Sequence, residues 1–106
     1  MRLRGGMSEL VRQASRLQRK IEARKKELES ETVEATAGND RVRAVASGAG
    51  TLVSVTIDPE LIRSESLELV QDLVVAAANA ALARSREMVE KEIDKVTGGL
   101  KVPGLT

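Results

Sequence analysis

The chain has 106 residues, 42% of them hydrophobic, yet it contains no Phe, Tyr, Trp, Cys or His. Missing Cys and His exclude a disulfide framework and a Cys or His nucleophile–base pair, and missing aromatic rings argue against base-stacking platforms for single-stranded nucleic acid. We therefore expect one small domain that is not an enzyme, with no catalytic site, metal, cofactor or small-molecule substrate.

The formal charge of +1 hides a strong asymmetry along the chain. Residues 1–26 hold nine Lys or Arg against two Glu, a net charge of +7, and residues 27–34 hold four Glu and no base. This distribution indicates a polyanion partner more than the whole-chain charge does. No run reaches the roughly 18 apolar residues that span a bilayer, so we expect a cytosolic protein with no membrane partner.

The first predicted element is an amphipathic helix from about Met7 to Glu29, with Ser8 as a candidate N-cap. At ~1.5 Å per residue it would be roughly 35 Å long, more than a small sheet can cover, so part of it must protrude or pair. Arg24 interrupts its coiled-coil-like spacing after about two heptads. The apolar stripe consists of Leu3, Met7, Leu10, Val11, Ala14, Leu17, Ile21 and Leu28.

A row of cations lies on this helix opposite the apolar stripe. Such a row can neutralise DNA phosphates, and two copies in a dimer would grip a duplex from two positions. The alternative is a solvated helix face without a ligand, although only Glu22 and Lys26 show the oriented i, i+4 pairing that usually supports such a face. The candidate DNA-binding residues in this row are Arg12, Arg16, Arg19, Lys20 and Lys26.

Three alternating segments predict an antiparallel meander of strands. They run from Thr32 to Ala37, from Arg41 to Ser47 and from Thr51 to Ile57, with glycine-containing turns between them. In the last strand the alternation places one set of side chains on one face, namely Val53, Val55 and Ile57, and the other set on the opposite face, namely Leu52, Ser54 and Thr56.

A short helical turn and a second long helix complete the predicted order. Asp58 is suited to cap the turn, with Pro59 in its first position. The longest apolar segment, Leu67 to Ile93, then predicts a helix that Ser64 opens. Gly98 and Gly99 should end this helix.

The second long helix is apolar on two opposite faces. One face should cover the sheet, and it carries Leu67, Val70, Val74, Ala77, Ala78, Ala81 and Leu82. The other needs a partner subunit, so we predict a homodimer whose interface contains Leu69, Leu73, Ala76, Ala80 and Ala83. Arg84 and Arg86, at the more polar end of this helix, are weaker candidates for DNA binding.

Four stretches together resemble the YbaB/EbfC family of bacterial nucleoid-associated proteins: GGMSELVRQASRLQRKIEARKKELES, VTIDPELI, LELVQDLVVAAANAAL and the closing GGLKVPGL. The resemblance covers nearly the whole chain and implies one YbaB-like domain, residues 1–106, in which we expect flexible ends at 1–6 and 98–106. It also implies a tweezers-shaped homodimer, with the first helices projecting from a joined β core and binding double-stranded DNA with little sequence demand.

We therefore predict an α+β fold of order α-β-β-β-α, with a three-stranded antiparallel meander between long amphipathic terminal helices. The predicted function is a homodimeric nucleoid-associated protein of the cytoplasm and nucleoid that compacts or bridges duplex DNA and modulates transcription. The alternative is a dimeric adaptor that docks a protein partner through the projecting first helices, using Leu10, Leu17, Ile21 and Leu28.

Overall fold

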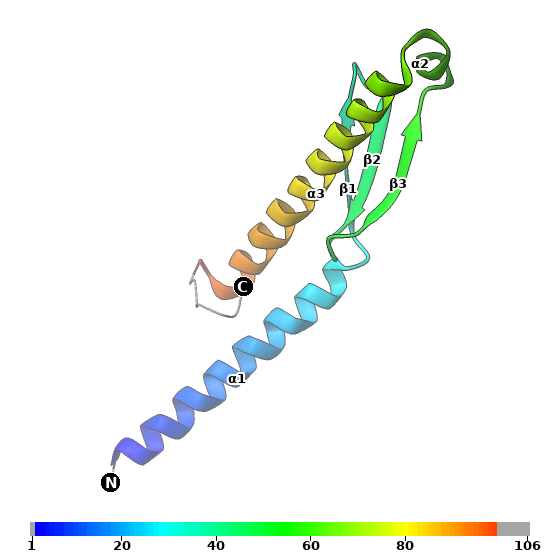
Figure 1. Cartoon of the computed structure of the whole chain (residues 1–106). Helices are drawn as coiled ribbons and strands as arrows, with labels where there is room; N and C mark the ends of the chain where they lie inside the picture. The colour runs from blue at the N-terminus through cyan, green and yellow to red at the C-terminus, as the bar shows by residue number, and fades with distance from the viewer. Residues whose placement is uncertain (1, 100–106) are drawn as a thin grey trace.

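The structure, a computed structural model, describes residues 2–99, with side chains from residue 6 onward. The described chain is a rod of 77 × 20 × 16 Å with α1 projecting from one end (Figure 1). The order confirms the predicted α+β fold, with the expected helical turn present as a short helix. The elements are α1 (Arg2–Leu28), β1 (Thr32–Ala37), β2 (Val42–Ser47), β3 (Leu52–Ile57), α2 (Pro59–Ser64) and α3 (Leu67–Thr97).

The main core lies between α3 and one face of the sheet. The strands form an antiparallel meander in the order β1-β2-β3, and α3 packs on β1 and β2 but barely touches β3. Figure 1 shows β3 lying clear of the helix. Ala44 and Ala46 in β2 and Ala77 and Ala81 in α3 are all fully buried. These small side chains allow the helix to approach the sheet closely.

A β-bulge changes the predicted faces of β3. Ala44 pairs with Val55 and Val45 with Ser54, but Ala46 pairs with Leu52, so Val53 is the extra residue. Directly paired residues point to the same face of an antiparallel sheet. Leu52 therefore shares the α3-facing side with Val55, and the prediction that placed Leu52 on the opposite face from Val55 was wrong.

The starts of both long helices differ from the prediction. α1 begins at Arg2 rather than near Met7, so Ser8 lies inside the helix and is not its N-cap. Its apolar spacing already includes Leu3, which favours this earlier start. Ser64 ends α2, and the cap of α3 is Ser66, whose hydroxyl accepts a hydrogen bond from the Leu69 backbone N–H at 3.2 Å.

The remaining helix boundaries follow the predicted signals. The Asp58 side chain accepts a hydrogen bond from the backbone N–H of Glu60 at 2.9 Å, and Pro59 occupies the first position of α2. Gly98 ends α3 in the left-handed region, at a φ of 64°, where glycine carries no Cβ penalty. The predicted flexible tail at 98–106 lies, from residue 100, outside the described residues, and flexibility of residues 1–6 stays a prediction.

A second, smaller core joins α1 to the C-terminal half of α3. Ile21 and Leu28 of α1 and Ile93 of α3 are buried together, and Leu17 packs against them. The turn between β2 and β3 closes on the end of α1, where the Gly48 N–H donates to the carbonyl oxygen of Glu31 at 2.9 Å. This joint fixes where α1 leaves the body.

Substituting Gly48 should destabilise the joint, because a Cβ there would overlap the backbone carbonyl of Leu28, which cannot move as a side-chain tip can. We expect Gly48→Ala to lower the free energy of unfolding by about 1–3 kcal/mol in thermal or urea unfolding. Gly6→Ala is the matched control: that Cβ would meet nothing within 4 Å, and α1 should gain about 0.5–1 kcal/mol. Equal effects from both substitutions would contradict the proposed overlap at Gly48.

Candidate nucleic-acid interface

The N-terminal half of α1 stands away from the rest of the described chain. Met7, Leu10 and Val11 are 60–62% exposed, whereas Ile21 and Leu28, further along the same stripe, are buried against α3. We call residues 2–16 of α1 the arm. The arm is a helix without a sheet beneath it, and its cations Arg12 and Arg16 are exposed on the side opposite the apolar stripe.

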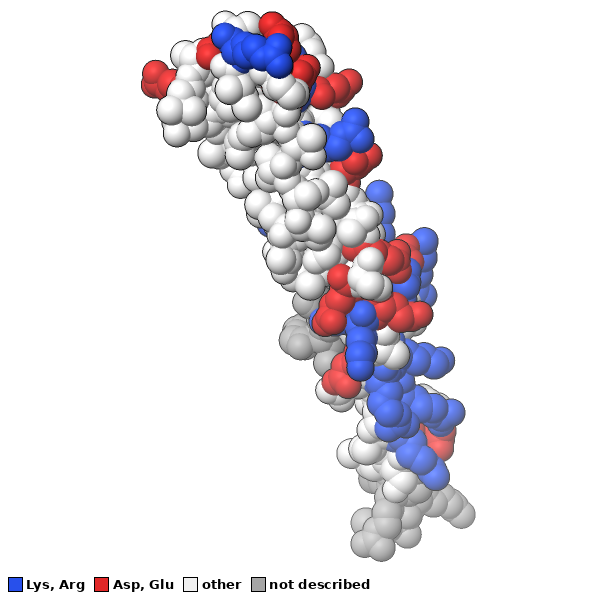
Figure 2. All heavy atoms as spheres, turned by 90° about the vertical axis from the view of Figure 1, so that its right-hand side faces the viewer, with Lys and Arg blue, Asp and Glu red and all other residues white. Residues whose placement is uncertain are grey.

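The five predicted DNA-binding residues of α1 are all exposed on that side. Figure 2 shows Lys and Arg side chains gathered over α1, and acidic side chains where α1 meets the rest of the molecule. From first to last member the row extends roughly 21 Å along the helix, which matches about six base pairs of a duplex. We call this set the cationic row: Arg12, Arg16, Arg19, Lys20 and Lys26.

The cationic row is only partly neutralised within the described chain. Glu9 lies 3.1 Å from the guanidinium of Arg12 and 3.8 Å from that of Arg16. Among the side chains of residues 6–99, Arg19, Lys20 and Lys26 form no ion pair, so the expected pairing of Lys26 with Glu22 is not present. The charge of these three side chains is therefore available to an external anion.

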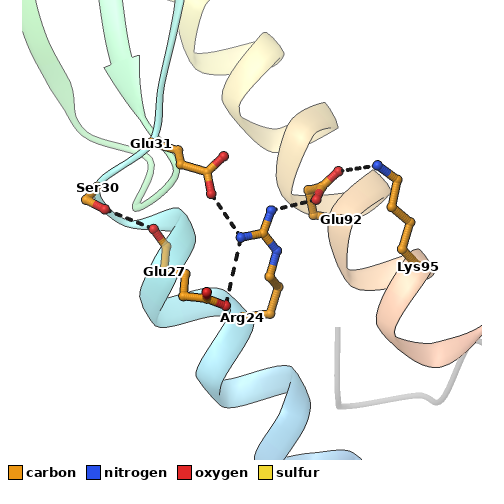
Figure 3. Close-up of polar contacts among 6 residues, drawn as sticks. All are labelled: Arg24, Glu27, Ser30, Glu31, Glu92 and Lys95. Carbon is orange, nitrogen blue, oxygen red and sulfur yellow. Dashed lines mark hydrogen bonds and ion pairs between the residues drawn. The ribbon is translucent and has the colours of Figure 1, made fainter.

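Arg24 has a different role from the cationic row. Its guanidinium donates to Glu31 at 2.9 Å and to Glu92 of α3 at 2.6 Å, and Glu92 also accepts from Lys95 at 2.7 Å (Figure 3). The Glu92 carboxylate, followed by Glu31, raises the pKa of Arg24. Arg24 thus ties α1 to two other segments and is partly buried, with 25% of its side chain exposed.

Sequence reasoning noted Arg24 only as an interruption of the apolar stripe. That interruption was the available signal, because a cation within an apolar seam needs a partner when the seam is covered. The partner could not be identified from the sequence, since Glu92 is 68 positions away and is one of many glutamates.

The two weaker candidates on α3 do not join the cationic row. Arg84 donates to the backbone carbonyl of Glu34 in β1 at 2.6 Å. Arg86 lines a shallow pocket with Gly48, Ala49 and Gly50 of the β2–β3 turn. Both side chains thus lie beside the sheet and not on α1. Their role in DNA binding stays a prediction.

The predicted dimer-interface residues of α3 differ in how far they are buried within their own chain. Leu73 and Ala80 pack against the core of their own chain, Leu69 and Ala76 are exposed, and Ala83 is half-buried. Their place in a dimer interface stays a prediction.

A second apolar surface lies on the side of the sheet that α3 leaves uncovered. It was not predicted from the sequence, because the periodicity of α3 does not show that the helix lies over β1 and β2 and away from β3. Figure 2 shows this face as a broad area with few charges over the β3 side of the sheet. We call six exposed apolar residues of β3, α2 and α3 the open apolar face: Leu52, Val53, Val55, Ile62, Leu67 and Val75.

The residues of the alternative adaptor hypothesis are mostly covered within the chain. Ile21 is 2% exposed and Leu28 is fully buried, both against α3. Leu17 is half-buried, so only Leu10 of the four is open to a partner. The structure therefore offers a much shorter docking stripe on α1 than the hypothesis needs.

Across residues 2–99, no helix is long and apolar enough to cross a membrane. The same part of the chain contains no group of three or more His, Cys, Asp or Glu side chains placed to hold a metal ion.

Comparison with known proteins gives consistent results. A model of the YbaB/EbfC DNA-binding family matches residues 4–100. A nucleoid-associated protein of Myxococcus xanthus is 47% identical over 96 residues, covering 91% of each chain. One of Desulforamulus reducens is 44% identical over 101 residues, covering 95% of this chain and 96% of the relative. The crystal structure of the uncharacterized protein HP0035 from Helicobacter pylori shares the fold, with a TM-score of 0.71 at 18% identity, covering 85% of this chain and 95% of that one.

The joint between α1 and α3 should respond to acid. Hydrogen bonds from Lys95 and Arg24 lower the pKa of the Glu92 carboxyl below its ordinary value. Because the folded-state pKa is the lower one, the contribution of Glu92 to stability is complete above a pH of about 5 and is lost as the pH falls through the folded-state value. We expect the native chain to melt above Glu92→Gln at pH 7, with the difference shrinking as the pH falls through the lowered folded-state pKa of Glu92. A difference that stays constant with pH would contradict this assignment.

Proposed function

Because the chain belongs to the YbaB/EbfC DNA-binding family, we propose that it is a nucleoid-associated protein whose cationic row binds double-stranded DNA. The observation that carries the proposal is the exposure of five cations on one side of a projecting helix, three of them without an ion pair among the side chains of residues 6–99. Lys and Arg in such a row suit phosphate oxygens, which every duplex presents at regular spacing.

Weak dependence on base sequence follows from the same chemistry. Phosphate contacts fix the register of a protein on a duplex but carry no base information. Gln13, the glutamine beside Arg12, donates to Glu9 at 3.3 Å within α1, and the chain has no aromatic side chain to insert between bases. Arginine could still contact guanine, but a helix held along the backbone would use its guanidinium groups on phosphates first.

A homodimer is the second part of the proposal. The open apolar face has Leu67 at 72% exposure and both Val53 and Val75 at 58%, and large apolar side chains exposed on one side of a small domain favour association with a partner. Two copies joined there would carry two arms. One dimer could then hold two positions on one duplex or bridge two duplexes, which would compact DNA and alter access to promoters in the nucleoid.

The DNA proposal predicts a salt dependence that can be measured by fluorescence anisotropy with a labelled duplex of random sequence. With about six phosphate contacts per dimer, log K against log salt should fall with a slope near −5. Changing Arg16 and Arg19 together to Gln should flatten the slope by about three to four, because the dimer loses four cations.

The matched control removes the same charge elsewhere. Arg43 and Arg63 are exposed and pair with surface acids at 3.3 Å and 3.0 Å, outside α1. Changing both to Gln should leave the affinity for the duplex, and the slope of log K against log salt, close to those of the native chain. If both double variants lose affinity equally, net charge rather than the cationic row is responsible, and absence of binding at low salt would remove the DNA proposal itself.

The dimer proposal predicts a particle mass of about twice the 11.4 kDa of the chain in light scattering. Val75→Asp places a charge on the open apolar face without disturbing the core, because the side chain is already 58% exposed. We expect it to shift the mass toward the monomer at micromolar concentration. Thr56→Asp, exposed on the opposite face of the sheet, should leave the mass unchanged, and a monomeric native chain would defeat the proposal.

A further inference from the structure

We propose that Arg24 and Glu92 set the direction in which α1 leaves the body, and that Glu92 thereby strengthens DNA binding although it is an acid. The inference rests on the proposed function, since it assigns a positioning role at the base of the same DNA-binding helix. It concerns two residues that lie outside the cationic row.

The joint makes the arm a lever. Only the stretch of α1 from Leu17 to Leu28 packs against α3, so the arm has no other support among the described residues. Arg12 lies twelve residues from Arg24, roughly 18 Å along the helix. A tilt of about 15° at Arg24 would move Arg12 by roughly 5 Å, more than the ~3.4 Å rise between successive phosphates of one strand. Small changes at the joint would therefore change the phosphates that the row can reach.

The apolar part of the joint does not fix this direction well. Only three of its side chains are fully buried, Ile21, Leu28 and Ile93, while Leu17, Met88, Val89 and Val96 pack around them and stay partly exposed, and hydrophobic attraction is non-directional. A helix held by so few side chains can roll or tilt on its partner at little cost in buried area. Directional contacts must supply the remaining constraint.

The Arg24 contacts have the required directionality. Its planar guanidinium uses separate nitrogens for Glu31, before β1, and for Glu92, on α3 (Figure 3). A fork that engages two acceptors constrains orientation more strongly than a single point charge can. Glu92 is itself held by Lys95 at 2.7 Å. The fork therefore relates α1 to two segments of the body at the same time.

The charge of Glu92 allows positioning to be separated from simple electrostatics. Removing an acid from a protein that binds a polyanion should raise affinity if only long-range charge matters. If Glu92 orients α1, its removal should lower affinity instead. The opposite signs of these two effects make a single substitution decisive.

We therefore expect Glu92→Gln to weaken duplex binding roughly threefold at fixed ionic strength, a change of the size that a partly exposed ion pair can control. Glu87→Gln is the matched control, because Glu87 is an exposed acid on the same helix and forms no ion pair with the side chains of residues 6–99. It should leave binding unchanged or slightly tighter. Arg24→Lys keeps the net charge but loses the fork, and it should weaken binding as Glu92→Gln does.

The arm direction can be measured independently of DNA. The chain has no cysteine, so spin labels can be placed at Gln13→Cys on the arm and Thr56→Cys on the sheet, with labelled chains diluted by unlabelled ones. Glu92→Gln should broaden the distance distribution between the labels, and Glu87→Gln should not.

The outcomes separate the inference from the proposed function. Tighter binding by Glu92→Gln, or unchanged distances in that variant, would overturn the positioning role while leaving DNA binding intact. Failure of the native chain to bind DNA would instead defeat the proposed function, and with it the effect on DNA binding assigned here to Glu92.

Discussion

The close contact of α3 with β1 and β2 is the constraint on which the other features of this molecule depend. The contact is lined by alanines, Ala44 and Ala46 from the sheet and Ala77 and Ala81 from the helix, and one buried hydrogen bond reinforces it, from the Ser85 hydroxyl to the Ser47 carbonyl at 2.6 Å. Because an alanine side chain is a single methyl group, these four positions can be in contact only if the helix lies close to the strands. A helix this close to two strands leaves the third uncovered.

The position of α3 also determines how much of the apolar stripe of α1 can be covered. Because α3 extends beyond the sheet, only its last turns are available to the first helix, and they cover less than half of the α1 stripe. The rest of α1 is held out in water with its cations accessible. Acidic residues follow directly, with Glu27, Glu29 and Glu31 at the joint. They would repel a duplex from the body and favour its contact with the cationic row, so the charge order of the sequence becomes a spatial order along the rod (Figure 2).

Local signals made most of the fold predictable from the sequence. The period of α1, the turn around Gly38 and the cap at Asp58 are each contained within a few residues, and all three occur in the structure. The cationic row was also predictable as a set of residues on one helix face. The exact cap of α3 was not, since Ser64 and Ser66 are equally plausible caps and only the length of α2 decides between them.

Features that depend on contacts between distant segments could not be predicted. The Arg24–Glu92 pair joins two helices whose relative placement follows from the sheet between them. The open apolar face exists because α3 lies off-centre, and periodicity gives the orientation of a helix about its axis but not its lateral position. The bulge at Val53 likewise depends on the register with β2, which alternation within β3 alone does not reveal.

The bulge at Val53 also affects the tendency of the protein to aggregate through its edge strand. β3 is an edge strand, and an edge with exposed valines and leucine is a template onto which further strands could add without limit, as in fibrils. An extra residue bends the strand and increases its local twist, so a flat strand from another molecule cannot pair along its whole length. The bulge at Val53 thus opposes fibril formation by an edge strand whose apolar side chains are exposed.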